Sequence, residues 1–208
     1  MRELRAVILA SASPRRHELL SSLGLRVLVM PTEVDETPPP GVAPRDLAIA
    51  HARAKADAAL ARIHRSVMVA ADTVVDVDGT PFNKPADPQE ARAMLRALSG
   101  RWHVVHTAFA VADGATGLRL EKCSSTRVRF VDLDADTIDA YVATGEPMDK
   151  AGGYGIQGRG AALADAIDGD FYTVMGLPLG VFVRSLPALG LRLAHDADEV
   201  AREREAAT

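Results

Sequence analysis

Two adjacent arginines stand at the start of an expected helix. Residues 6–10 form a short apolar run typical of a buried strand, and Ser13-Pro14 is typical of a helix start. The free backbone N–H groups and the dipole at a helix start attract anions. Arg15 and Arg16 in the first turn oppose that dipole, at a cost of a few tenths of a kcal/mol or more. Because arginine offers forked donors that match phosphate oxygens, this run favours a negatively charged ligand. Solvated surface arginines are the alternative.

A single carboxylate interrupts the most strand-like run of the chain. Residues 67–77 are apolar and β-branched except for a few positions, one of which is Asp72. A carboxylate in a buried strand must be paired, hydrogen-bonded or metal-bound, because burying an unpaired charge is costly. Asp72 is therefore either a functional group or a carboxylate that a nearby helix cap or arginine satisfies.

Two lysines and an acidic stretch could complete such a site. Lys55 lies in a long expected helix, and Lys84 lies at the end of an expected hairpin. From residue type alone we expect both lysines to be solvated. Residues 33–36, which include Glu36, could supply oxygen ligands to a hard cation such as Mg²⁺. A solvated loop is the reading of this stretch that composition favours.

Residues 149–158 are rich in glycine, which permits positive φ angles and a close approach of backbone to a ligand. Their spacing is neither that of a phosphate-binding Walker loop nor that of a dinucleotide-binding fingerprint. A ligand-contacting loop and a flexible surface loop are both compatible with this pattern.

These residues are distributed over alternating strand-like and helix-like segments. The hydrophobic periodicity and the turn residues predict a mixed α/β fold with a mixed sheet. Hairpin turns are expected at Asp78-Gly79, Asp113-Gly114 and Asp168-Gly169. We expect strands over 6–10, 26–30, 67–77, 102–111 and 118–131, and helices over 13–24, 43–63, 87–100 and 134–145 and from 178 onward.

Composition narrows the class of protein. The chain has 208 residues, of which 48% are hydrophobic and 25% charged, as is ordinary for a globular protein. We expect one domain over 1–194 and a polar tail over 195–208. A net charge of −4 and an aromatic fraction of 4% argue against a protein that coats nucleic acid. No run is long and apolar enough for a membrane span. The single cysteine, Cys123, and the lack of a convincing signal peptide favour a cytoplasmic protein.

Taken together, the motifs resemble those of the Maf-like proteins, a family of nucleoside triphosphate pyrophosphatases. The resemblance extends over roughly residues 6–190 and includes five blocks in order along the chain. The blocks are Leu9-Ala10-Ser11-Ala12-Ser13-Pro14-Arg15-Arg16, Ala71-Asp72-Thr73 with Lys84-Pro85, Ser99-Gly100 with His103 and Thr107, Asp149-Lys150-Ala151-Gly152 with Tyr154-Gly155-Ile156-Gln157-Gly158, and Val174 with Gly176-Leu177-Pro178.

The resemblance implies a fold and a reaction. The fold would be an elongated, curved, mixed sheet flanked by helices, with two lobes around a cleft, similar to the inosine triphosphate pyrophosphatase fold. The reaction would cleave the α–β phosphate bond of a nucleotide with the help of a divalent cation such as Mg²⁺ or Mn²⁺, releasing pyrophosphate. The sequence is similar to the branch that acts on dTTP and UTP, and such proteins are commonly homodimers.

The resemblance also implies roles for particular residues. Asp72 would be the catalytic residue and a metal ligand, and Glu36 a second metal ligand. Base preference would depend on Arg15, Thr73 and Gln157. The remaining residues that would bind substrate are Ser11, Arg16, Lys55 and Lys84.

Two other functions stay open on the sequence alone. The protein could be a non-catalytic regulator of cell division that binds nucleotide, or a phosphatase that removes the terminal phosphate. The physiological nucleotide, canonical or modified, is also open.

Overall fold

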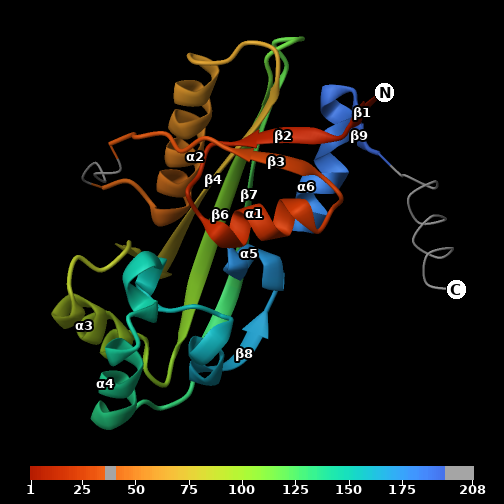
Figure 1. Cartoon of the computed structure of the whole chain (residues 1–208). Helices are drawn as coiled ribbons and strands as arrows, with labels where there is room; N and C mark the ends of the chain where they lie inside the picture. The colour runs from red at the N-terminus through yellow and green to blue at the C-terminus, as the bar shows by residue number, and fades with distance from the viewer. Residues whose placement is uncertain (36–40, 195–208) are drawn as a thin grey trace, which may run out of the picture.

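The computed structural model describes residues 1–35 and 41–194 (Figure 1). Glu36 and the expected tail over 195–208 lie outside the described residues. The strands are β1 Arg2–Leu4, β2 Ala6–Leu9, β3 Arg26–Val29, β4 Val67–Val77, β5 Thr80–Phe82, β6 Trp102–Asp113, β7 Arg119–Phe130, β8 Ala164–Asp168 and β9 Leu191–Leu193. The α-helices are α1 Pro14–Ser21, α2 Pro44–Leu60, α3 Pro88–Leu98, α4 Ala135–Ala143, α5 Phe171–Met175 and α6 Leu179–Ser185, and the 3₁₀ helices are η1 Glu146–Asp149, η2 Ala151–Gly153, η3 Gly158–Leu163 and η4 Leu186–Leu189.

A seven-stranded mixed sheet organises the molecule, which confirms the expected mixed α/β class. Its strand order is β3-β2-β4-β6-β7-β8, with β5 paired to β4. The strands β3, β2 and β4 are parallel, whereas β4, β6, β7 and β8 are antiparallel. The long strands β4, β6 and β7 run from the part that holds β2, β3 and α1 to the part that holds α3, α4 and β8 (Figure 1).

The two faces of the sheet are covered by different helices. Along β4, odd-numbered residues such as Val69 and Val75 face a large core that includes side chains of α1, α3 and α6. Even-numbered residues such as Met68 and Val74 face α2. This alternation is the period of a pleated strand, and it directs Asp72 and Thr73 to opposite faces.

One edge of β4 lacks a partner strand over a short stretch. β2 reaches only as far as Leu9, opposite Val69, and β5 pairs from Phe82, opposite Val75. Between these two points, within the described residues, no strand pairs with this edge, although β6 pairs with the opposite edge throughout. Side chains from both faces of β4 can therefore reach the same opening at this gap.

Most of the expected turns and caps are confirmed. Asp78 and Gly79 both have positive φ, at 52° and 82°, as the two-residue turn between β4 and β5 requires. The side chains of Asp87 and Asp134 accept hydrogen bonds from backbone N–H groups at the starts of α3 and α4. Ser13 precedes α1 as expected, but its side chain makes no capping bond.

The hairpin expected at Asp168-Gly169 is wrong. Gly169 connects β8 to α5, not to another strand. The reason is the next residue, Asp170, whose carboxylate accepts from the backbone N–H of Thr173 and caps α5. Asp170 is also hydrogen-bonded to β7. Thr126 Oγ1 accepts from the backbone N–H of Asp170 and donates to its carbonyl oxygen. The Asp-Gly pair therefore leads into a helix start.

Within residues 1–35 and 41–194, no helix combines the length and the hydropathy that a membrane span requires.

The backbone of η2 packs directly against β4, which gives a stability test. Gly152 has a φ of 71°, and a Cβ added there would lie 2.9 Å from Val75 Cγ2. Its neighbour Gly153 has a φ of 70°, but a Cβ there would meet nothing nearer than 3.8 Å. We expect Gly152→Ala to lower the free energy of unfolding by about 1–3 kcal/mol more than Gly153→Ala, because both carry the backbone strain and only one adds the overlap. Urea denaturation measures the difference, and equal losses would contradict the close packing.

Candidate active site

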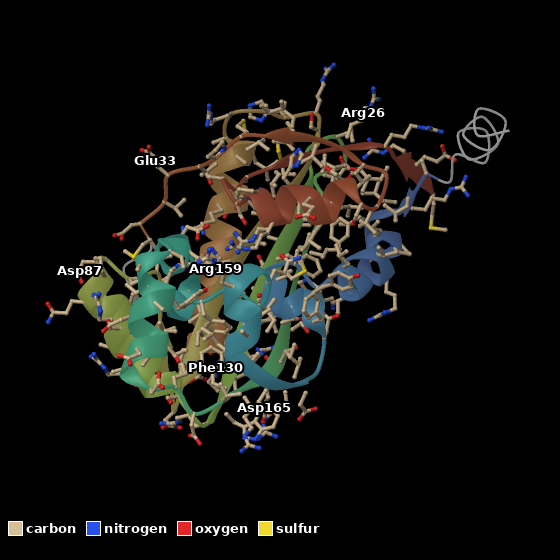
Figure 2. The ribbon with its side chains drawn as sticks, turned by 60° about the horizontal axis from the view of Figure 1, so that its bottom comes forward. Arg26, Glu33, Asp87, Phe130, Arg159 and Asp165 are labelled. Carbon is tan, nitrogen blue, oxygen red and sulfur yellow. The ribbon has the colours of Figure 1, made fainter. Side chains whose placement is uncertain are left out.

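A cavity of about 360 Å³ opens at the unpartnered edge of β4. Its walls come from the β2–α1 connection, α1, α2, β4 and the segments around η1, η2 and α5. Nitrogen-bearing side chains gather in this region, between α1 and the segment that carries Arg159 (Figure 2). The residues singled out from the sequence that line the cavity are Ser11, Arg15, Arg16, Lys55, Asp72, Thr73 and Lys84.

Arg16 fixes a positive charge in the wall of this cavity. Its Nε donates to the carbonyl of Gly176 over 2.9 Å, its Nη1 to Ser11 Oγ over 3.0 Å, and its Nη2 to Thr73 Oγ1 over 3.0 Å. Because these acceptors lie on different segments, the guanidinium ties α1 to β4 and to the residue after α5. Its planar fork is thereby held in one orientation.

The hydroxyl of Thr73 belongs to a chain of hydrogen bonds with a definite direction. Thr107 Oγ1 donates to the carbonyl of Thr173 over 2.6 Å, and it lies 3.0 Å from Thr73 Oγ1. A hydroxyl has one proton to donate, so Thr73 must donate to Thr107 and accept from Arg16. Thr107, which is fully buried on β6, therefore supports the cavity wall from behind.

Asp72 is a buried carboxylate held by two side chains of α2. Lys55 Nζ lies 2.7 Å from its Oδ1, and His51 Nδ1 lies 3.1 Å from its Oδ2. Asp72, His51 and Lys55 are 7%, 5% and 8% exposed. Burial acts to raise the pKa of Asp72, but the His51 hydrogen bond and the charges of Lys55 and Arg16 outweigh it and lower that pKa below its ordinary value. Asp72 is therefore ionised at neutral pH.

The two lysines singled out from the sequence differ in environment. Lys55 is buried, so the expectation from its residue type that it is solvated is wrong. The reason is its partner, because Asp72 compensates the charge that burial would otherwise penalise. Lys84 is exposed as expected, although it also lines the cavity.

Sequence reasoning missed His51. Its position four residues before Lys55 places both side chains on one face of a helix, and this spacing was the available signal. The spacing by itself does not reveal that Asp72 lies opposite that face.

The glycine-rich stretch forms the wall opposite α1. Lys150 Nζ donates to the carbonyl of Glu146 over 2.7 Å and to Asp149 Oδ1 over 2.6 Å. Across the cavity, Arg15 Nη1 lies 3.4 Å from Asp149 Oδ2. Asp149, Lys150 and Gly155 of this stretch are among the lining residues of the cavity, and contact with a ligand stays a prediction.

Tyr154 supports this wall from the core. Its hydroxyl lies 2.7 Å from Nε2 of His103, and the rings of both residues pack edge-on against Phe130. Burial lowers the pKa of His103 to about 4, so His103 is neutral at neutral pH. Burial also disfavours the charged form of Tyr154, and it therefore raises the pKa of the Tyr154 hydroxyl.

Comparison with known proteins identifies the family. A family model described as Maf-like protein matches residues 6–189. The chain belongs to this family. A relative named dTTP/UTP pyrophosphatase from Pelotomaculum thermopropionicum is 43% identical over 90% of this chain and 98% of its own length. One of the same name from Methylobacillus flagellatus is 45% identical over 92% of this chain and 96% of its own length.

A solved structure of lower sequence identity also matches this chain. This structure, described as a nucleoside-triphosphatase / dITP/XTP pyrophosphatase from Mycobacterium abscessus, matches 88% of this chain and 98% of its own. The TM-score is 0.45 and the sequence identity 16%, an overlap that carries no functional argument.

One residue that the Maf-like resemblance singles out lies apart from the others. Gln157 is exposed and is not among the lining residues, although its neighbour Ile156 is. Glu36 falls in the range that the structure does not describe.

Among the described residues, the carboxylate of Asp72 fits a cation that arrives together with its ligand. Residues 1–35 and 41–194 contain no group of three or more His, Cys, Asp or Glu side chains arranged to hold a metal ion. Mg²⁺, however, is often held by one or two carboxylates together with substrate phosphates and water. Asp72 fits that requirement, because each of its oxygens has two lone pairs and accepts one hydrogen bond from α2.

His103 gives the protein a predictable pH dependence. Its pKa is about 4 when folded and near 6.5 when unfolded, so the unfolded chain binds more protons between these values. We expect the free energy of unfolding to fall by about 3 kcal/mol from this residue as the pH decreases across that window. Urea denaturation from pH 7.5 downward measures it.

The control is His103→Phe, which keeps an aromatic ring and removes the titrating group. This variant should be less stable at neutral pH, because it leaves the Tyr154 hydroxyl without its partner. Its free energy of unfolding should also fall less as the pH decreases, because the contribution of His103 is missing. Parallel pH profiles for the two proteins would contradict the assignment.

Proposed function

We propose that this protein is a nucleoside triphosphate pyrophosphatase. It hydrolyses the α–β phosphate bond of dTTP or UTP and releases the nucleoside monophosphate and pyrophosphate. The observation that carries the proposal is an ionised, buried Asp72 that shares one cavity with Arg15, Arg16 and Lys84. Membership of the Maf-like family and the names of the relatives support the same activity.

The cations of the cavity suit a polyphosphate. Arg16 is fixed by its hydrogen bonds. Within residues 1–35 and 41–194, Arg15 makes only the 3.4 Å contact to the half-exposed Asp149, and Lys84 is exposed. Arg15 and Lys84 can therefore turn toward phosphate oxygens at little cost. Fixed and adjustable positive charges together offset the charge of the ligand and stabilise the charge that develops on the leaving pyrophosphate.

Asp72 is the proposed general base. The lone pairs that α2 does not use can accept a proton from an attacking water or hold a cation carried by the phosphates. Direct attack by water is favoured over a covalent intermediate. In the described part of the chain no cysteine lines the cavity, and Ser11 Oγ contacts donors but no base.

The finer parts of the proposal follow the resemblance. When bound, Mg²⁺ or Mn²⁺ polarises the phosphoryl oxygens and offsets their charge. Asp72 and Glu36 would hold it together with the phosphates. Gln157, the chain neighbour of the lining residue Ile156, would present both a donor and an acceptor to a pyrimidine edge. A homodimeric state and a cytoplasmic location also belong to this proposal.

The test compares wild type with Asp72→Asn on a panel of nucleotides with Mg²⁺, Mn²⁺ or Co²⁺. We expect wild type to release pyrophosphate most efficiently from dTTP and UTP. Asp72→Asn should keep the fold but lose turnover by about 10²-fold or more, the scale of general-base loss. Release of pyrophosphate and of orthophosphate is measured separately, and circular dichroism checks the fold of the variant.

Each contrary outcome has its own meaning. Near-wild-type pyrophosphate release by Asp72→Asn would refute the role of this carboxylate. Nucleotide binding by wild type without any release would favour a regulator. Release of orthophosphate in place of pyrophosphate would indicate a phosphatase.

A further inference from the structure

The carboxylate of Asp72 is held at both oxygens by one helix. Lys55 Nζ contacts Oδ1, and His51 Nδ1 contacts Oδ2. An ionised carboxylate only accepts hydrogen bonds, so His51 must carry its proton on Nδ1 and donate it. The tautomer of this buried histidine is thereby fixed by its partner.

We propose that His51 is a positioning residue for the reaction: through Nδ1–H it holds the carboxylate plane of Asp72 in the orientation that the substrate meets. This role rests on the proposed function, since it acts through Asp72. It is separate from the roles that the family resemblance implies, none of which falls on His51.

The packing of α2 makes this possible. Its buried face carries Ala48, Ala52 and Ala56 against the even-numbered side of β4, and small side chains allow helix and strand to approach closely. His51 and Lys55, one turn apart, therefore reach the same carboxylate from the same side.

Without His51, the carboxylate would keep only the hydrogen bond from α2 that Lys55 donates to Oδ1. The terminal torsion of aspartate has broad wells, so a carboxylate bonded only at Oδ1 can rotate about its Cβ–Cγ bond. Rotation would redirect the lone pairs that face the cavity. Small errors in such geometry slow the chemical step more than they weaken substrate binding.

Variants of His51 that differ in the position of the donor nitrogen test whether the hydrogen bond to Asp72 is required. Asparagine places its amide nitrogen at the position of Nδ1, whereas glutamine places it one bond farther out, and leucine offers no donor. We expect His51→Leu and His51→Gln to lower kcat by about 10- to 100-fold with little change in KM, as is typical when the orienting partner of a reactive group is lost. His51→Asn should retain most of the wild-type kcat. His64→Leu, at an exposed histidine just after α2, is the matched control and should be unchanged.

A second measurement needs no turnover. Long-range ¹⁵N–¹H correlation spectra of imidazole-labelled wild type report which ring nitrogen of His51 carries the proton, and we expect Nδ1. A proton on Nε2 alone would overturn the proposal even if His51→Leu fails to fold.

The remaining outcomes distinguish a failure of the role proposed for His51 from a failure of the proposed pyrophosphatase activity. Equal kcat values for the Leu and Asn variants, with equal losses of thermal stability, would overturn positioning and indicate a purely structural partner. Normal wild-type turnover with an unchanged kcat in His51→Leu would overturn the role of His51 alone. Failure of wild type to release pyrophosphate from any nucleotide would overturn the proposed function itself.

Discussion

The need to compensate one buried negative charge shapes the centre of this molecule. A carboxylate as buried as Asp72 carries a desolvation penalty of several kcal/mol, which only well-placed donors and cations repay. The hydrogen bond from His51 and the charges of Lys55 and Arg16 outweigh that penalty and lower its pKa. This requirement explains why α2 carries two polar residues on a face that is otherwise alanine-rich, and why that face lies close to β4.

The gap at the edge of β4 is the second constraint. Because no strand pairs there between Val69 and Val75 within the described residues, the opening receives side chains from both faces of the sheet. Arg16 lines this opening and is held there by its hydrogen bonds to Ser11, Thr73 and Gly176. The same bonds that stabilise the join between α1 and β4 therefore keep a positive charge facing the ionised carboxylate.

Local patterns predicted the elements well. Alternation along residues 67–77, the caps Asp87 and Asp134 and the turn at Asp78-Gly79 depend on neighbours within a few positions, and these predictions are confirmed. The hairpin predicted at Asp168-Gly169 is wrong, because the same dipeptide can also precede a capped helix. The pairing of β1 with β9 joins Arg2 to Leu191, and no local signal encodes a contact of that range.

Several residues of the candidate site could be predicted from the sequence, but their burial and their contacts could not. The residues carried over from the Maf-like motifs line a common cavity, except for the exposed Gln157 and for Glu36, which lies outside the described residues. The burial of Lys55 and the contact of His51 with Asp72 could not be read from residue types. They depend on which helix face meets which strand position, and that follows from tertiary packing.

The most direct measurement is a crystal structure with a dTTP analogue whose α–β bridging oxygen is replaced by a methylene group, in the presence of Mg²⁺. We predict the α-phosphate beside Asp72 and the outer phosphates against Arg15 and Lys84. Phosphates bound away from Asp72, for example in a separate cavity whose lining residues include His64 and Arg119, would contradict the central claim.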